Sequence, residues 1–107
     1  MSYKYMRLLI MFDLPMDTNM EKREYREFRH FLIENGFLML QYSVYCRICT
    51  NQTMADNYMK KIEKFLPSDG SVRGLIITEK QYEKMKIFLG QKSKQERIIT
   101  DKKIIIF

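Results

Sequence analysis

The feature that most constrains the fold of this chain is a short apolar run that ends abruptly at an acid and a proline. Residues 8–12 are Leu, Leu, Ile, Met and Phe, and they are followed by Asp13, Leu14 and Pro15. A continuous apolar run of this length is typical of a strand buried on both faces of a sheet. Pro15 cannot continue the ladder of backbone hydrogen bonds, so the strand must stop near Asp13. The run therefore places one carboxylate at the mouth of a strand, where sheet folds often bind a ligand or a metal.

The length and the charge of the chain narrow the classes of protein to which it can belong. Its 107 residues predict one domain over residues 1–107, and 46% of them are apolar, enough for a real core. It carries 19 Lys and Arg against 13 Asp and Glu, a formal net charge of +6. This surplus favours a polyanionic partner, nucleic acid before an anionic membrane surface, although a soluble protein that is merely basic fits the charge equally well.

The start of the chain argues against a secreted or membrane protein, and its cysteines argue against a zinc-binding protein. The residues after Met1 show no signal-peptide profile and no apolar run approaches ~18 residues, so we expect a cytoplasmic protein that does not enter a membrane. Cys46 and Cys49 form a lone Cys-x-x-Cys pair without a second pair or a nearby histidine, which argues against a zinc site. On a strand the two thiols would point to opposite faces, so we interpret them as reduced residues in or near the core.

The first part of the chain predicts a strand followed by a helix. Residues 4–13 form the strand. Thr18 and Glu21 form a capping box that starts the helix, which runs to about Asn35 and stops at Gly36. One apolar face of this helix should pack on the sheet, and it is formed by Tyr25, Phe28, Phe31 and Leu32.

The middle of the chain predicts further strands around a second helix. Residues 37–50 are rich in aromatic and branched side chains, so they form one long strand, or two strands joined by a bulge or a tight turn near residues 41–43. A second helix follows, with Thr53 as its N-cap and Pro67 at its end. Residues 72–78 form another strand.

The last part of the chain predicts elements that need a partner. Residues 79–84 form about one helical turn, residues 85–89 are strand-like, and residues 104–107 form an apolar terminal strand that needs a sheet edge. We therefore expect residues 85–107 to be an extension that pairs across a homodimer and contacts a partner protein. The whole order predicts an α+β fold of the ferredoxin-like β-α-β-β-α-β type with extra C-terminal strands, in which both helices cover one face of the sheet.

Basic residues in several elements are candidates for contact with nucleic acid, because Lys and Arg neutralise phosphates and release counterions. Glu24 and Glu27 dilute the basic stripe on the first helix, so a solvated helix face is an equally open interpretation there. The candidates on the first helix, on the strands and near the C-terminal elements are Lys22, Arg23, Arg26, Arg29, Arg47, Arg73, Lys80, Lys84 and Lys86.

Four short segments stand in the order and at the spacing typical of a known protein family. They are Met-Phe-Asp-Leu-Pro at residues 11–15, Arg-Glu-Tyr-Arg-Glu-Phe-Arg at 23–29, Gly-Phe at 36–37 and Gln-Tyr-Ser-Val-Tyr at 41–45. With these segments the chain resembles, over nearly its whole length, the CRISPR-associated protein 2 family, the small partner of the CRISPR integrase in spacer acquisition. The pattern is most similar to the version found beside type II systems.

This resemblance implies a fold, partners and a disputed activity. It implies a ferredoxin-like homodimer that lies between two dimers of the CRISPR integrase and helps to hold duplex DNA during spacer acquisition, a step of antiviral defence. It also implies metal-dependent nuclease activity on RNA or DNA, in which Asp13 binds a divalent cation such as Mg²⁺ together with its symmetry mate. Three residues would lie near this site: Phe12, which stands where many members have a tyrosine, Ser43 and Tyr45.

The residues themselves leave the role of Asp13 open. Phosphodiester cleavage with Mg²⁺ needs several oxygen ligands, and one protomer offers one acid at this strand end, so catalysis would need a dimer axis nearby. Alternatively, the carboxylate caps a backbone turn. Our first prediction is a non-catalytic dimeric scaffold that bridges integrase dimers on duplex DNA. The alternatives are a Mg²⁺-dependent endoribonuclease or endodeoxyribonuclease of the same fold, with single-stranded RNA as a further partner, and an unrelated RNA-binding module or toxin-like ribonuclease.

Overall fold

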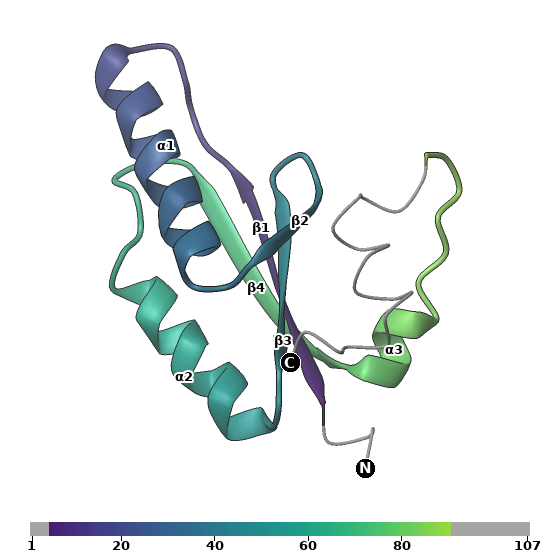
Figure 1. The fold of residues 1–107 in the computed structure, drawn as a ribbon. Coiled ribbons are helices and arrows are strands. Elements are labelled where there is room, and N and C mark those ends of the chain that lie inside the picture. Colours follow the sequence, from purple (N-terminus) through teal and green to yellow (C-terminus); the bar gives the residue numbers. More distant parts are fainter. Residues whose placement is uncertain (1–4, 91–107) are drawn as a thin grey trace.

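The computed structural model describes residues 5–90, whose helices and strands are drawn in Figure 1. In chain order the elements are β1 (Met6–Asp13), α1 (Asn19–Glu34), β2 (Leu38–Gln41), β3 (Val44–Cys49), α2 (Gln52–Glu63), β4 (Ser71–Thr78) and α3 (Glu79–Glu83). The order β-α-β-β-α-β confirms the predicted ferredoxin-like α+β fold, and α3 is the predicted helical turn after the last strand. Residues 37–50 form two strands joined by a tight turn, not one.

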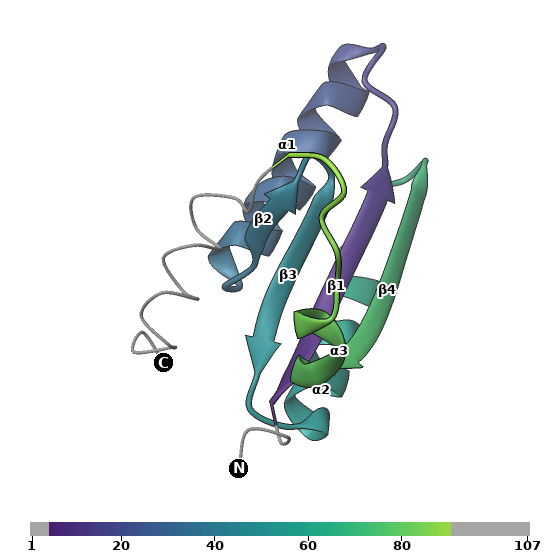
Figure 2. The ribbon, with the colours of Figure 1, turned by 90° about the vertical axis from the view of Figure 1, so that its right-hand side faces the viewer.

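The four strands form one antiparallel sheet in the order β2-β3-β1-β4. β1 is central, and its Leu8 faces Arg47 of β3 on one side and Ile76 of β4 on the other. α1 and α2 cover one face of the sheet, as right-handed crossovers require, whereas α3 lies against the opposite face (Figures 1 and 2). We call these the helix face and the α3 face.

The ends of α1 are fixed by the residues that the sequence predicts. Thr18 Oγ1 accepts a hydrogen bond from the backbone N of Glu21 at 3.1 Å, and Glu21 Oε1 accepts one from the backbone N of Thr18 at 3.0 Å, which confirms the capping box. The helix ends at Glu34, and Gly36 follows with a φ of 84°, which glycine adopts without strain. Within residues 5–90, no helix combines the length and the apolar character needed to span a bilayer.

The N-cap of α2 is Asn51, so the predicted N-cap Thr53 is wrong. Asn51 Oδ1 accepts a hydrogen bond from the backbone N of Met54 at 2.8 Å, and Thr53 lies inside the first turn. Asn is among the strongest N-cap residues, and the apolar spacing that starts at Met54 does not distinguish the two candidates. The helix ends at Glu63, before Pro67 is reached, so Pro67 follows the helix without terminating it directly.

The main core lies between the sheet and the helix face. The Phe12 ring packs edge-on against Phe28, with centroids 5.3 Å apart, and stacks on Tyr45 at 5.6 Å. Tyr25 and Phe31 are half-buried around this core. The residues buried in it are Leu8, Ile10, Phe12, Phe28, Leu32, Phe37, Tyr45, Cys49, Ala55 and Ile62. The predicted apolar face of α1 is therefore the one that packs on the sheet.

The α3 face carries a second and smaller cluster. Its buried members are Leu9, Cys46 and Tyr82, and Ile77 packs against them. Cys46 thus lies on the α3 face and Cys49 on the helix face, as the alternation of a strand predicts, and both are free and buried.

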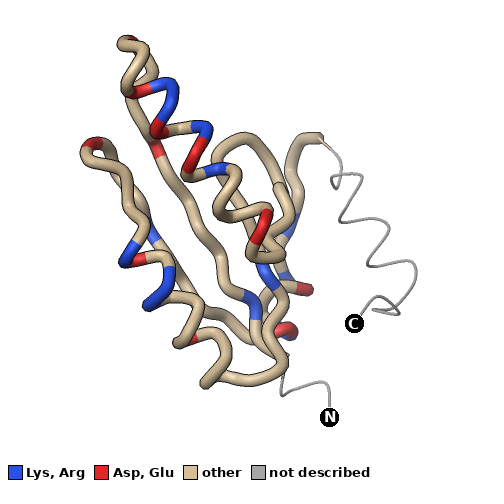
Figure 3. The backbone as a smooth tube through the Cα atoms, turned by 60° about the vertical axis from the view of Figure 1, so that its left-hand side comes forward, with Lys and Arg blue, Asp and Glu red and all other residues tan. Residues whose placement is uncertain are grey.

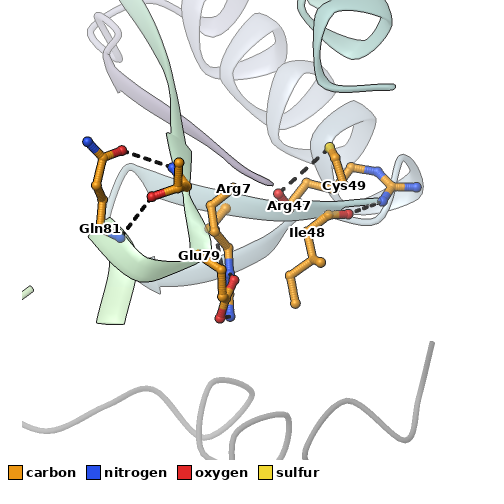
Figure 4. Close-up of polar contacts among 8 residues, drawn as sticks. Arg7, Arg47, Ile48, Cys49, Glu79 and Gln81 are labelled. Atoms are coloured by element: carbon orange, nitrogen blue, oxygen red, sulfur yellow. Dashed lines mark hydrogen bonds and ion pairs between the residues drawn. The ribbon is translucent and has the colours of Figure 1, made fainter. Parts of the chain in front are cut away.

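Arg7 fastens α3 to this face. Its guanidinium donates two hydrogen bonds to the carboxylate of Glu79, Nε to Oε1 at 2.7 Å and Nη2 to Oε2 at 2.9 Å (Figure 4). The guanidinium also lies 3.9 Å above the ring centre of Tyr82. Burial alone lowers the pKa of Arg7, but its bonds and charge interactions with Glu79 and Cys46 outweigh burial, so the pKa is raised. Arg7 is thus a buried cation whose partner carboxylate belongs to α3.

The predicted strand over residues 85–89 is not present, and this prediction is wrong for the described protomer. Residues 85–90 run without regular structure after α3, and Phe88 and Leu89 are 93% and 95% exposed. A strand needs a neighbour to take its backbone hydrogen bonds, and no described strand of the protomer pairs with this segment. The predicted strand over residues 104–107 lies outside the described residues.

Candidate functional site

Asp13 is the last residue of β1 and is exposed. It pairs with Ser71 at the start of β4, and the alternation of β1 places its side chain on the α3 face. Among the described residues, no hydrogen bond or ion pair reaches its carboxylate, so the alternative in which Asp13 caps a backbone turn does not occur there. The carboxylate is therefore free to meet a ligand.

Two turns hold the backbone around Asp13. The turn between β2 and β3 is tied to β1 by a hydrogen bond from the backbone N of Phe12 to the carbonyl of Ser43 at 3.1 Å. On the other side, Gly70 lies so close that a side chain there would approach the Asp13 carbonyl oxygen to 2.8 Å. Gly70 also has a φ of 101°, so only glycine fits this loop without strain. The carboxylate thus projects from a rigid strand end.

The resemblance places Phe12 and Tyr45 near the site. Their side chains pack on the helix face, opposite to the side chain of Asp13. Both side chains are buried on the helix face, with exposed fractions of 7% and 1%. Their stacked rings fix the strand on which Asp13 stands, but neither ring is open to a substrate. Of the three predicted neighbours, Ser43 contributes its backbone carbonyl to the fixation of β1.

The described residues of one protomer do not fit a complete metal site. No group of three or more His, Cys, Asp or Glu side chains within residues 5–90 is placed to hold a metal ion. Mg²⁺ requires about six oxygen ligands, and a site with one carboxylate leaves most of them to water or to another molecule. The predicted Mg²⁺ therefore does not fit a single protomer, and a shared site would need a second Asp13.

The basic residues of α1 form an exposed surface. Figure 3 shows that blue Lys and Arg segments alternate with red Asp and Glu segments along this helix. A groove along α1 is lined by Tyr25 and Glu27 together with Arg23, Arg26, Arg29 and His30. The only described ion pair on α1 joins His30 to Glu34, Nε2 to Oε2, at 3.2 Å. The α1 arginines thus keep their charge available, and Lys22 is exposed in the same helix.

A second set of basic residues lies on the other side of the sheet. Arg73 faces Met11 across the β1–β4 ladder, two residues from Asp13 and on the same face. It is therefore the predicted nucleic-acid residue that the sheet brings nearest to Asp13 in register. Lys80 and Lys84 are exposed on α3 and at its end, and Lys86 is exposed in the segment that follows.

Arg47 is committed to the fold. It lies on the helix face, where its Nε donates to the carbonyl of Asn35, its Nη1 to that of Ile48 and its Nη2 to the hydroxyl of Tyr58, each at 2.8 Å (Figure 4 shows the bond to Ile48). Its guanidinium also lies 4.1 Å above the Tyr58 ring centre. These contacts close the end of α1 against α2 and engage one N–H on each of the three guanidinium nitrogens. We therefore leave Arg47 out of the proposed nucleic-acid surface.

Tyr42 is not among the site residues that the sequence predicts, and the structure places it at the turn beside the end of β1. Its side chain is exposed and its ring stacks on Tyr25 of α1, with centroids 6.4 Å apart. In the sequence, Tyr42 stands in a strand-like segment. Its ring reaches α1 because the chain reverses direction after Gln41. The break at residues 41–43 in the alternation of apolar and polar side chains is the sequence signal that could have predicted this turn.

Comparison with known proteins identifies the family of this chain. The family model for CRISPR associated protein Cas2 matches residues 6–85. A protein of Ligilactobacillus salivarius, named CRISPR-associated endoribonuclease Cas2, is 52% identical over 101 residues, which cover 94% of this chain and 100% of the relative. Proteins of the same name from Lacticaseibacillus rhamnosus and Campylobacter jejuni are 43% and 41% identical, over 94% and 97% of this chain and 100% and 73% of the relatives.

A solved structure described as a crystal structure of Cas2 shares the fold. It superposes with a TM-score of 0.56 over 84% of this chain and 91% of that chain, at 14% sequence identity. The family model and the relative from Ligilactobacillus salivarius show that the chain belongs to the CRISPR-associated protein Cas2 family.

Proposed function

We propose that this chain is an endoribonuclease that cuts single-stranded RNA at the end of β1, with Asp13 as its reactive carboxylate. The observation that carries the proposal is the exposed Asp13 side chain at the end of the central strand, without a partner among the described residues. The name endoribonuclease that the relatives carry supports this activity ahead of the scaffold that our first prediction favoured.

A free carboxylate at a fixed strand end suits phosphodiester chemistry. It can accept the proton of the hydroxyl or water whose oxygen bonds to the phosphorus, while the bond from phosphorus to the leaving ribose oxygen breaks and that oxygen takes a proton from water. Such proton transfer typically contributes about 10²–10⁴-fold to the rate. The Phe12–Ser43 hydrogen bond and the close approach of Gly70 hold this strand end in place. Such placement matters because a displacement of about 1 Å can cost about 10²-fold in rate.

A homodimer and a divalent cation belong to the same proposal. Two copies of Asp13 beside a two-fold axis would provide the second carboxylate that one protomer lacks. The α3 face and the segment after α3 offer apolar surface for a second copy, because Leu75, Phe88 and Leu89 are exposed there by 50%, 93% and 95%. In this arrangement, residues 85–107 would serve as the dimer-forming extension.

The test uses end-labelled single-stranded RNA and single-stranded DNA of the same sequence. We expect the purified chain to cut the RNA in the presence of Mg²⁺, to leave it intact when EDTA replaces the cation, and to spare the DNA. Sedimentation of the same sample should give a dimer. RNA that remains intact with Mg²⁺, Mn²⁺ and Ca²⁺ alike would contradict the proposal, and cleavage that persists in EDTA would contradict its metal dependence.

A scaffold that bridges integrase dimers on duplex DNA is the second candidate. It is favoured by basic residues that lie on both sides of the sheet, on α1 and again at Arg73, Lys80 and Lys84. A dimer would double the net charge of +6 and present these residues symmetrically, which suits a duplex recognised through its phosphates.

Charge reversal on α1 tests the scaffold. We expect Arg26→Glu with Arg29→Glu to weaken binding of duplex DNA at least about tenfold and to flatten its dependence on salt. The matched control is Lys60→Glu on α2 with Lys64→Glu at its C-cap, which makes the same change of charge on residues that are also exposed. Equal losses in the two double variants would show a nonspecific effect of net charge and would remove α1 from the proposed surface.

A further inference from the structure

Tyr42 is an exposed aromatic residue at the turn beside the candidate site. The turn between β2 and β3 consists of Tyr42 and Ser43, and 66% of Tyr42 is exposed. Ser43 has a φ of 65°, a left-handed conformation that is strained for a residue with a side chain. The fold therefore maintains a strained turn that presents a large ring to solvent.

The Tyr42 ring is backed by a row of aromatic rings that ends at Phe12, whose side chain lies on the helix face of β1, next in sequence to Asp13 on the α3 face. It stacks on Tyr25 with centroids 6.4 Å apart and an interplanar angle of 26°. Tyr25 in turn meets the edge of Phe12, at 6.1 Å and 64°. Phe12 directly precedes Asp13 in β1. One side of Tyr42 is thus packed on Tyr25, and the exposed side lies at the same end of the sheet as the carboxylate.

The turn is also fixed to the strand that carries Asp13. The backbone N of Phe12 donates to the carbonyl of Ser43, the neighbour of Tyr42, at 3.1 Å. At its other end the turn is held by the pairing of Gln41 with Val44. A ring on a short turn with both ends paired is preorganised, so a ligand that stacks on it loses little freedom of the protein.

Positive charge lies beside the stacked rings. Arg26 and Arg29 line the α1 groove together with Tyr25, and both are exposed. Arg29 stands four residues after Tyr25 in α1, so the two side chains lie on the same side of the helix. No described carboxylate forms an ion pair with either arginine. The two guanidinium groups are thus available to phosphates next to Tyr42.

We propose that Tyr42 binds an unpaired base of single-stranded RNA by stacking, while Arg26 and Arg29 bind the adjacent phosphates, at the end of the sheet where β1 ends in Asp13. This inference rests on the proposed ribonuclease function and names how its substrate is held. Exposed aromatic rings interleaved with basic side chains are the usual platform for single-stranded nucleic acid, because every base has a face that can stack. A duplex keeps its bases stacked on each other, so this platform favours single strands.

Binding is measured without cleavage, in EDTA and with Asp13→Asn as the background of every variant. The probes are a labelled oligoadenylate and an RNA-like oligomer of equal length and charge that lacks bases. Tyr42→Ala removes the ring and Tyr42→Phe retains it. The matched control is Phe65→Ala on the far side of α1, because Phe65 is also exposed, by 46%, and is stacked on an α1 residue, Phe31, at 4.4 Å.

We expect Tyr42→Ala to weaken oligoadenylate binding about 5- to 100-fold without changing the affinity for the abasic oligomer. Tyr42→Phe and Phe65→Ala should each bind both probes within about threefold of the background protein. Circular dichroism checks the fold of each variant. NMR of the background protein with labelled tyrosine rings gives a second readout, since the Tyr42 signals should shift with oligoadenylate and stay in place with the abasic oligomer.

Equal losses for the two probes in Tyr42→Ala, or unchanged Tyr42 signals with bound oligoadenylate, would overturn the stacking proposal. A background protein that binds both probes equally tightly would overturn it as well. These outcomes differ from a failure of the proposed function, which appears as intact RNA in the cleavage assay even when base stacking on Tyr42 is present.

Discussion

The two faces of the sheet are built by the same strands, yet they are closed to different degrees. On the helix face, α1 and α2 bury a continuous core of ten residues. On the α3 face, a helix of five residues covers three buried residues, and Leu75 remains half exposed. Adjacent residues of β1 therefore stand in different environments, since Leu8 belongs to the first cluster and Leu9 to the second.

This difference separates a face of the sheet that is closed within the protomer from a face of the sheet that a partner can still cover. The helix face is covered by α1 and α2, and its polar member Arg47 donates three hydrogen bonds within the chain. The α3 face combines exposed apolar residues with Asp13 and Arg73. A face of this kind is where a second copy or a substrate gains most from binding.

The largest expected effect comes from truncation of the two neighbouring leucines of β1. Leu8→Ala should lower the free energy of unfolding by about 4 kcal/mol, since its site is fully enclosed, and Leu9→Ala by about 2 kcal/mol, since its smaller cluster lies beside exposed surface. Urea unfolding measures both. Equal losses in the free energy of unfolding would mean that the α3 face excludes water as well as the helix face does. If stability then also depended on protein concentration, a second copy of the chain would be what covers the α3 face.

The ion pair that holds α3 gives the next effect. Glu79→Gln leaves the guanidinium of Arg7, a residue that is 6% exposed, without a counter-charge, so we expect α3 to detach and stability to fall by about 2 kcal/mol. Hydrogen exchange should show faster exchange in α3 than in α1. The double variant Arg7→Met with Glu79→Gln should recover most of the loss, because no buried charge remains. Unchanged exchange in Glu79→Gln would show that other contacts hold α3.

A smaller effect concerns pH at the edge of the helix face. Burial, and secondarily the neighbouring Tyr42 hydroxyl, raise the pKa of Tyr25 from 10.0 to about 12. A raised pKa favours the neutral phenol in the folded state. Its contribution to stability is thus present below about pH 10 and is lost as the pH rises towards about 12. Ultraviolet titration of the parent against Tyr25→Phe measures this ionisation, and a midpoint near pH 10 would contradict the burial of Tyr25.

The sequence predicts the elements of the helix face well because their signals are local. The capping box of Thr18 and Glu21, the stop at Gly36 and the apolar face with Phe28 and Leu32 each depend on residues within a few positions of one another. The N-cap of α2 shows the limit of such signals. Asn51 and Thr53 are both good caps, and only the bond of Asn51 to Met54 separates them.

The candidate site was predictable only in part, because its remaining features depend on contacts between distant segments. Asp13 was found from the end of one strand. That Arg47 is bound by Asn35 and Tyr58 follows from the packing of α1 against α2, which no spacing shows. The exposed residues 85–89 resemble a strand in sequence, but a strand also needs a neighbour, and pattern alone does not provide one.

The most direct test of the account is the rate at which Asp13→Asn cuts single-stranded RNA at saturating RNA and Mg²⁺, relative to the parent and to Asp56→Asn. Asp56 is an exposed acid of α2, so its variant makes the same change of charge away from the strand end. We predict a loss of about 10²-fold or more in Asp13→Asn alone, with unchanged RNA affinity. Cleavage by Asp13→Asn at the rate of the parent would show that this carboxylate is not the reactive group and would contradict the account.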